Sequence, residues 1–278
     1  MRLHAALGLC AGFFWATAAS AYIPPSQFIV RTMAVKRQGN KAFRVRTTVY
    51  EMEGQRTSGT SFKQITVFDL NSRVMRSRAY DNAGKELYAV ERRLHEHSPI
   101  AGGLPVAALL LDQSTDSLSR VLRTAGIPIR TEAELSDMKD EEERRSTEVT
   151  SLGRLGSVVG WVIGPGKKDL AWPQLWIEKD TFHPMRLVER TDEGTLDVRF
   201  SEFRYYKEIP FPRVITVLRA SRDEGAQEPM LREELADVII NPEMGEMRSP
   251  LVQGFTDAGN SADGSVRDLI RLYYASLR

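Results

Sequence analysis

The sequence predicts an α+β fold that is mostly antiparallel β-sheet, and two observations support this prediction. Short runs that alternate between apolar and polar residues recur along the 278 residues, and this alternation places successive side chains on opposite faces of a strand. Segments rich in Gly, Pro, Asn and Asp separate the runs, which is typical of consecutive strands joined by turns. We therefore expect one large sheet, with a few helices covering it.

The clearest strands lie between residues 172 and 217. Leu175 and Ile177 alternate there with Trp176 and Glu178, so the two pairs should face opposite sides of the sheet. Turn-forming segments interrupt the alternation, which resumes after each of them, at residues 180–184, 192–194 and 209–212. This part of the chain is predicted to be an antiparallel meander.

The same stretch also resembles a known family. The runs that carry the resemblance are PQLWIEKDTFHPMRL, VRFSEF and FPRVITV, which begin at Pro173, Val198 and Phe211. They are similar to the second half of the LolA family of periplasmic lipoprotein carriers and outer-membrane lipoprotein-sorting proteins, and the resemblance extends loosely over residues 24–245. It implies an incomplete half β-barrel of about ten strands, covered by an N-terminal helix and lid helices, with an apolar cavity that takes acyl chains.

The first 21 residues predict a cleaved signal peptide. Arg2 supplies a positive charge, Leu3 to Trp15 is almost wholly apolar, and Ala19-Ser20-Ala21 is the pattern of small residues before a cleavage site. An uncleaved anchor helix is the alternative, but the apolar run is short for spanning a membrane. We expect a periplasmic protein that begins near Tyr22.

Composition argues against several classes of protein. Cys10, the single cysteine, lies inside the predicted signal peptide, so the mature protein would contain no disulfide and no thiolate nucleophile. The chain has 38 Lys and Arg against 37 Asp and Glu, and loss of Arg2 leaves 37 of each. A balanced charge of this kind does not indicate binding to nucleic acid.

The rest of the predicted domain, residues 22–248, repeats the same elements. An N-terminal helix is expected near residues 26–35, with an apolar stripe of Phe28, Ile29, Met33 and Val35. Further strands are expected near residues 43–50, 61–70, 73–80, 86–93, 148–152, 157–163 and 234–242.

Residues 104–125 predict two helices of unusual apolarity. Val106 to Leu111 is a continuous apolar run, and Leu118, Val121 and Leu122 recur at helical spacing. The resemblance implies that such helices form a lid over the cavity. A plug that completes the core fits the same residues, and the sequence leaves both interpretations open. The family's carrier also uses an arginine near its lid to hold the closed state, and the sequence does not reveal which arginine of this chain corresponds to it.

Two segments depart from the family's carrier. Residues 131–148 are dense in charge and are expected to form a solvated insertion. Residues 249–278 are expected to form a flexible tether up to Gly264 and then an amphipathic helix. The apolar stripe of that helix, which could dock on the domain or on a partner, consists of Val266, Leu269, Ile270, Tyr273 and Leu277.

The sequence shows no recognisable catalytic set. It lacks the G-x-S-x-G motif of α/β-hydrolases, and its carboxylates are scattered among basic residues. His95 and His97 could supply two zinc ligands, but no third ligand has a suggestive spacing, and His183 precedes Pro184 in a turn. We therefore predict no enzyme activity, no catalytic residues, no metal site and no cofactor, with an envelope hydrolase as the weakest alternative.

The predicted function is binding of lipid or lipoprotein acyl chains by a monomer, in the sorting of outer-membrane lipoproteins. An acyl chain gains about 0.8 kcal/mol for each methylene that is buried, so such a protein needs an apolar groove rather than catalytic groups. The alternative is an envelope sensor or scaffold that binds a membrane protein through the terminal helix or the charged insertion. The candidate groove residues are Phe43, Val45, Val49, Val159, Trp161, Ile163, Leu175, Ile177, Met185, Leu187, Val198, Phe200, Leu109, Leu110, Val121 and Leu122.

Overall fold

The computed structural model of the protein describes residues 23–93, 104–130, 134, 136–137, 150–164, 172–191, 194–221, 227–243 and 251–276. The predicted signal peptide, His95, His97 and nearly all of the charged insertion lie outside the described residues.

The strands form one antiparallel sheet of twelve strands, in the order β12-β4-β3-β2-β1-β11-β10-β9-β8-β7-β6-β5. The sheet is open, because β12 and β5 are its two edges, and this confirms the incomplete half-barrel of the predicted α+β class. The prediction of about ten strands was slightly low. The strands are β1 (Ala42–Glu53), β2 (Arg56–Asp69), β3 (Val74–Tyr80), β4 (Glu86–Arg93), β5 (Thr150–Leu155), β6 (Val158–Ile163), β7 (Gln174–Glu178), β8 (Pro184–Thr191), β9 (Gly194–Tyr206), β10 (Ile209–Ser221), β11 (Gln227–Ile240) and β12 (Gly254–Phe255).

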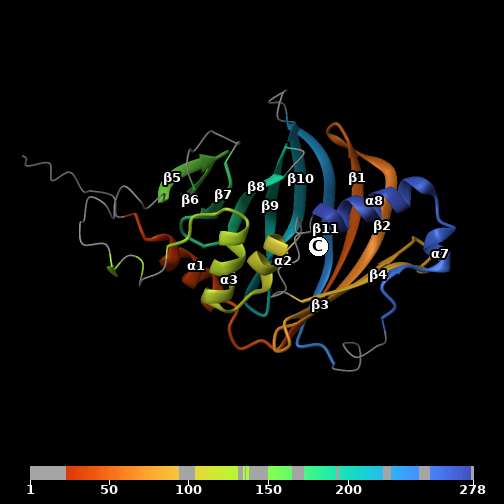
Figure 1. Ribbon diagram of the computed structural model, residues 1–278, viewed down its shortest axis with the longest axis horizontal. Helices are drawn as coiled ribbons and strands as arrows, with labels where there is room; N and C mark the ends of the chain where they lie inside the picture. Colours follow the sequence, from red (N-terminus) through yellow and green to blue (C-terminus); the bar gives the residue numbers. More distant parts are fainter. Residues whose placement is uncertain are drawn as a thin grey trace, which may run out of the picture.

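The pairing of β1 with β11 joins the two halves of the chain. Strands β5 to β11 follow one another in sequence order across the sheet, as do β1 to β4. At the junction, Phe43 lies opposite Ile240 and Val45 lies opposite Val238. The meander at residues 172–217 and the strands of the first half therefore belong to one curved sheet (Figure 1).

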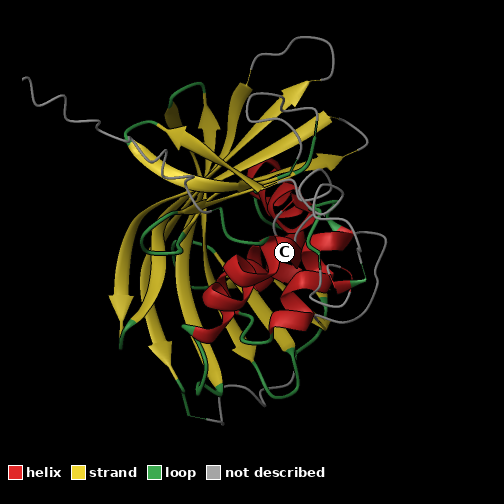
Figure 2. Ribbon diagram, turned by 90° about the vertical axis from the view of Figure 1, so that its left-hand side faces the viewer, coloured by secondary structure: helices red, strands yellow, loops and turns green. Residues whose placement is uncertain are grey.

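The helices lie within the curve of the sheet, on its concave side (Figure 2). Their apolar side chains and those of the concave face form one hydrophobic core. None of the described helices is long and apolar enough to cross a membrane. The helices are α1 (Ser26–Val35), α2 (Leu104–Leu111), α3 (Thr115–Thr124), α7 (Asp257–Asn260) and α8 (Gly264–Ser276).

Helix α1 buries a different stripe from the predicted one. Ile29 and Met33 are buried as expected, but Phe28 and Val35 are 40% and 49% exposed. Val30 and Ala34 take their places in the core, which α1 shares with α3. The prediction was wrong for Phe28 and Val35 because two overlapping stripes were possible on this helix.

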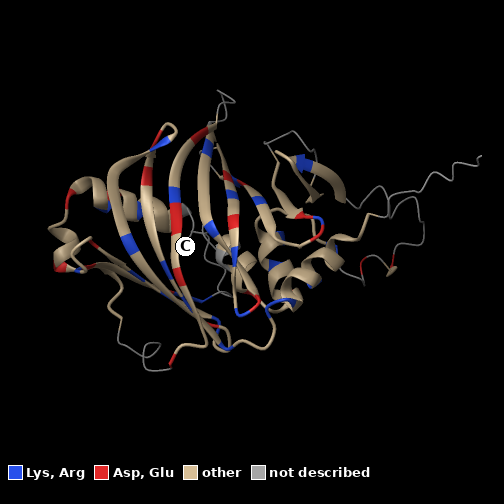
Figure 3. Cartoon of the chain, turned by 180° about the vertical axis from the view of Figure 1, so that it is seen from behind, with Lys and Arg blue, Asp and Glu red and all other residues tan. Residues whose placement is uncertain are grey.

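Charged residues recur along the strands of the sheet (Figure 3). One group is deeply buried there: Arg186 Nε and Nη2 donate to Asp197 Oδ1 and Oδ2 over 2.6 and 2.8 Å. Arg199 and Gln227 also donate to the same carboxylate, whose side chain is completely buried. These donors satisfy the carboxylate oxygens of Asp197 in place of water.

The predicted flexible tether is wrong for residues 254–260. Gly254 and Phe255 form β12 and pair with Ala89 and Tyr88 of β4. Helix α7 then packs on β4 so closely that a Cβ atom on Gly259 would lie 2.0 Å from the carbonyl oxygen of Leu87. A residue without a side chain is required at this contact, which fixes the approach to α8.

Helix α8 packs against the concave face at β2. The ring of Tyr273 is fully buried and meets Phe62 edge-on, with 5.5 Å between the ring centroids. Gln64 Nε2 donates to Tyr273 Oη over 3.0 Å, and Arg92 Nη2 donates to the carbonyl of Tyr274 over 3.2 Å. The described part of the predicted apolar stripe thus faces the protein's own sheet.

Candidate functional site

The candidate site is a small cavity on the concave face, between α2 and the centre of the sheet. Its volume is about 30 Å³. The lining is mostly apolar and comes from β1, β2, β3, α2, β10 and β11: Val45, Thr47, Thr66, Met75, Leu110, Leu111, Phe211, Pro212, Ile215, Glu233 and Leu235.

Helix α2 packs into the core beside this cavity. Val106, Leu109 and Leu111 are buried, and the helix is covered in turn by α3. The remaining volume suits about one or two water molecules, whereas sites for small organic ligands usually enclose about 300–1,000 Å³. In this conformation α2 therefore acts as a plug, and a large ligand requires its displacement.

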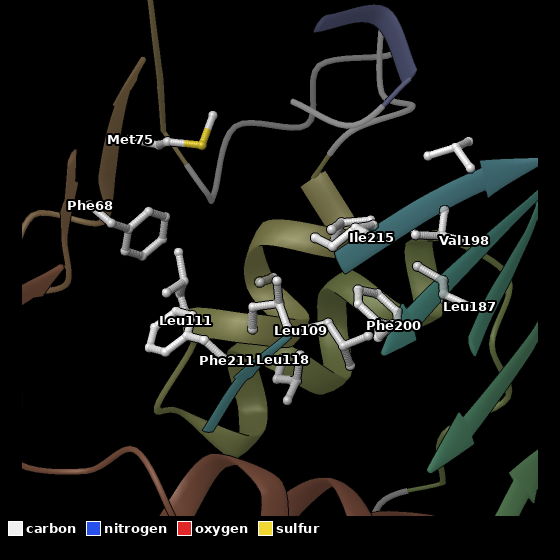
Figure 4. Packing of buried hydrophobic residues seen from close by; sticks show 14 of the residues in the cluster. Phe68, Met75, Leu109, Leu111, Leu118, Leu187, Val198, Phe200, Phe211 and Ile215 are labelled. Carbon is white, nitrogen blue, oxygen red and sulfur yellow. The ribbon is translucent and has the colours of Figure 1, made fainter. Parts of the chain in front are cut away.

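Most of the predicted groove residues come together in the main core on this concave side, but only Val45 and Leu110 line the cavity. Figure 4 shows Leu109 of α2 facing Phe200, Ile215 and the side chains of neighbouring strands. The predicted residues that lie buried in this core are Phe43, Val49, Trp161, Ile163, Leu175, Ile177, Leu187, Val198, Phe200, Leu109, Leu110 and Leu122. Val45 and Val121 are half-buried at its edge, and Val159 is half-buried outside it.

Met185 was assigned to the wrong face of the sheet. It packs with Val162 and Trp176 in a separate small cluster. The register between β7 and β8 shifts after Trp176, so that Trp176 lies opposite Arg186 and Ile177 lies opposite Pro184. This bulge places Met185 and Arg186 on the same side of the sheet, which strict alternation does not predict.

Polar side chains interrupt the apolar lining of the cavity. Glu233 is 2% exposed and lies between Leu231 and Leu235 on the inward face of β11. Thr66 Oγ1 and Ser77 Oγ are 2.8 Å apart, and Thr47 Oγ1 has no hydrogen-bond partner among the described residues. The alternation of β1 and β11 places Thr47 and Glu233 on the inward face, but the predicted groove residues were all apolar.

Arg37 lies beside the end of α2, and the sequence did not single it out. It follows α1, is 3% exposed, and its Nη1 lies 3.4 Å from the carbonyl oxygen of Asp112, directly after α2. Burial lowers the pKa of the Arg37 guanidinium to about 10, and the negative charge of Asp112 partly opposes this shift. The guanidinium remains charged at neutral pH and holds the end of α2.

Asp112 and Ser114 form the turn between α2 and α3. Asp112 Oδ1 accepts a hydrogen bond from the backbone N of Ser114 over 2.9 Å. Ser114 Oγ in turn accepts from the backbone N of Ser117 and caps the start of α3. The contact with Arg37 is thus made at the point where the two helices are joined.

Glu189 is a half-buried carboxyl group on β8. It lies two residues after Leu187, opposite Leu196 of β9. Burial raises the pKa of Glu189 to about 8, so the group is largely protonated at neutral pH.

His183, the histidine within the described residues, packs against aromatic side chains. Its ring stacks on Phe203 with 4.4 Å between centroids, and Nε2 lies 3.1 Å from Tyr205 Oη. Burial lowers the pKa of His183, and the carboxylate of Glu178, 3.7 Å from Nδ1, opposes this shift. No three His, Cys, Asp or Glu side chains gather to hold a metal ion in the described part of the chain.

Comparison with known proteins gives likenesses of structure only. No protein-family model matches the chain, and no curated protein matches it. A LolA superfamily protein from Nitrosomonas europaea has a TM-score of 0.48 and 7% identity, covering 82% of this chain and 98% of its own. This chain is similar in fold to that LolA superfamily structure.

Two further solved structures are similar. A putative outer membrane lipoprotein-sorting protein domain from Vibrio parahaemolyticus has a TM-score of 0.45 and 8% identity, covering 80% of this chain and 95% of its own. A DUF1329 family protein from Desulfovibrio piger has a TM-score of 0.40 and 9% identity, covering 81% of this chain and 98% of its own. Likenesses of this degree concern the arrangement of strands and do not identify a ligand.

Proposed function

We propose that this protein is a periplasmic carrier that holds an acyl chain of a lipid or lipoprotein on the concave face of its sheet, in the sorting of outer-membrane lipoproteins. The observation that carries the proposal is the position of α2. Its apolar side chains occupy the concave face beside an apolar cavity, and a polar contact with Arg37 holds its end. Helix α2 then acts as a lid that an acyl chain replaces.

The free energies of burial favour this exchange. Moving Leu109, Leu110 and Leu111 from the core into water costs about 1.5–3 kcal/mol for each side chain. A chain of about sixteen carbons gains about 12 kcal/mol when it is fully buried. The chain therefore offsets the exposure of all three leucines, so the closed protein can open when an acyl chain is present.

Uptake of a fluorescent fatty acid by the delipidated protein tests the proposal. We expect saturable binding by the wild type, and about tenfold weaker binding when Leu235, which lines the cavity, is replaced by Gln, because the chain must then desolvate an amide. Ala236→Gln is the matched control, since Ala236 is the next residue of β11 and is exposed. The proposal is wrong if the wild type binds no fatty acid and no lipid accompanies it from the periplasm in native mass spectrometry.

The alternative role as a sensor or scaffold gains no support from the terminal helix. Leu269, Ile270 and Tyr273 are buried against the chain's own sheet and are not available to a partner. The charged insertion, the other predicted contact, lies almost entirely outside the described residues. The carrier is therefore the function that the described geometry supports best.

A further inference from the structure

A second, polar pocket lies beside the turn that joins α2 and α3. Its volume is about 300 Å³, roughly ten times that of the apolar cavity. Three turns of the chain line it: the α2–α3 turn supplies Asp112 and Gln113, the α1–β1 turn supplies Asn40, and the β2–β3 turn supplies Asn71 and Arg73. The proposed movement of α2 would change the shape of this pocket, because Asp112 is attached to the end of that helix.

Asp112, which contributes to the lining of this pocket, has one buried carboxylate oxygen that is unused as an acceptor. The residue is 4% exposed, and its Oδ1 accepts from Ser114 N over 2.9 Å. Its Oδ2 has no hydrogen-bond partner among the described residues. Arg37 meets the carbonyl oxygen of Asp112 and forms no ion pair with the carboxylate in the described structure. A buried carboxylate oxygen without a donor is costly, and a donor that carries a positive charge would satisfy it best.

The polar pocket adjoins the apolar cavity on two elements. On β2, Thr66 lines the cavity and Phe68, the next residue on the same face, lines the pocket. At the end of α2, Leu111 lines the cavity and Asp112 lines the pocket. Figure 4 shows the side chains of Phe68 and Leu111 beside one another. These two side chains separate the pocket from the cavity, so a displacement of α2 would connect them.

We propose that the polar pocket binds the head group of an amphiphile whose acyl chain enters the cavity, and that this head group carries a primary ammonium that donates to Asp112 Oδ2. The inference rests on the proposed acyl-chain binding and adds the class of head group. Arg73 contributes a positive charge to the same lining, so the pocket suits a head group that also bears a phosphate.

Binding of two single-chain phospholipids tests this inference. Lysophosphatidylethanolamine carries a primary ammonium with three N–H donors, and lysophosphatidylcholine of the same chain length carries a quaternary ammonium with none. We expect the delipidated wild type to bind the ethanolamine lipid about tenfold more tightly. Asp112→Asn, which keeps an acceptor for Ser114 N but removes the charge, should reduce the ratio of the two affinities to near one. Asp116→Asn, the same substitution at an exposed position of α3, should leave the ratio unchanged.

The outcomes separate this inference from the function on which it rests. Equal binding of the two lipids by the wild type overturns the head-group site but supports acyl-chain binding. Binding of neither lipid overturns both. Tight binding of free ethanolamine, without a chain, would show a site for small amines and would also overturn the inference. The comparison of the two lipids uses the wild type alone, so it tests the head-group site even if Asp112→Asn does not fold.

Discussion

The Nη1 atom of Arg37 lies 3.4 Å from the carbonyl oxygen of Asp112, so a buried cation meets the end of α2 at the turn to α3. Replacement of Arg37 by Leu removes this contact with the end of α2. We expect amide hydrogen exchange in residues 104–125 to become about tenfold faster, since a hydrogen bond from a charged group contributes about 1.5–3 kcal/mol. Arg31→Leu, at an exposed position of α1, is the control, and equal exchange in the two variants would contradict a role of Arg37 in lid closure.

Asp197 is predicted to be a sensitive position for stability. It is fully buried and accepts hydrogen bonds from Arg186, Arg199 and Gln227. Asp197→Ala leaves Arg186 buried without its partner and should lower the free energy of unfolding by about 3–5 kcal/mol in urea denaturation.

Asp237 provides the matched control for this experiment. It pairs with Arg46 over 2.8 Å, but the two side chains are 32% and 52% exposed. Asp237→Ala should cost less than about 1 kcal/mol, because exposed ion pairs contribute little. If Asp197→Ala also lowers the free energy of unfolding by less than about 1 kcal/mol, the hydrogen bonds to the Asp197 carboxylate do not stabilise the fold.

Because Glu189 is protonated in the folded protein, we expect the free energy of unfolding to fall as the pH rises. Its pKa is raised to about 8 in the folded protein, so between pH 4.5 and 8 the folded state binds more protons than the unfolded state. The contribution of Glu189 to the free energy of unfolding is therefore fully present below its unfolded pKa. It falls as the pH rises from 4.5 to 8, because the folded protein then has to ionise a half-buried carboxyl group.

Glu189→Gln should remove this dependence. We expect the difference in unfolding free energy between pH 5 and pH 8 to shrink by about 1–3 kcal/mol in this variant. This is less than the full pKa shift of Glu189 would give, because the side chain keeps some contact with water. The exposed Glu53→Gln variant corrects for general effects of charge. An unchanged pH profile in Glu189→Gln would assign the dependence to other groups.

Tyr273 tests whether α8 is a structural part of the domain. Tyr273→Phe keeps the ring on Phe62 but leaves the amide of Gln64 without its acceptor, at a cost of about 1–2 kcal/mol. Tyr273→Ala also removes the buried ring and should cost about 3–5 kcal/mol. Arg271→Ala, at an exposed position of the same helix, should leave the stability nearly unchanged. Thermal unfolding of the three variants measures these differences. A neutral Tyr273→Ala would indicate that α8 detaches readily.

The sequence was sufficient to predict the sheet and most of its inward residues. Apolar and polar residues alternate along each strand, and this alternation distinguishes the buried face of the strand from the exposed one. It failed at Met185, where a bulge changes the face and where nothing in the local pattern marks the extra residue. It also failed at α1, since Phe28 and Val30 are both apolar and only the position of α3 decides which of them is buried. The docking of residues 254–260 was missed because a Gly-rich segment indicates flexibility until its partner strand is known.

The candidate site was harder to predict than the fold. The sequence predicted that Leu109 and Leu110 are apolar helix residues, and both are buried, but whether α2 is a lid or a plug depends on the volume left beneath it. Arg37 and Asp112 come from separate segments, and no spacing in the sequence relates them. Polar lining residues such as Glu233 were passed over because an acyl-chain site was expected to be apolar.

The junction between β1 and β11 has a consequence for the order of folding. Asn241 accepts a hydrogen bond from the backbone N of Lys41 over 2.6 Å, across 200 residues of sequence. During synthesis the first strands emerge long before their neighbour β11, with one edge unpaired and the apolar concave face uncovered. Contacts of such long range slow folding and lengthen the time for which intermediates can aggregate. The nascent first half of the protein is therefore expected to need protection by chaperones until the last long strand arrives.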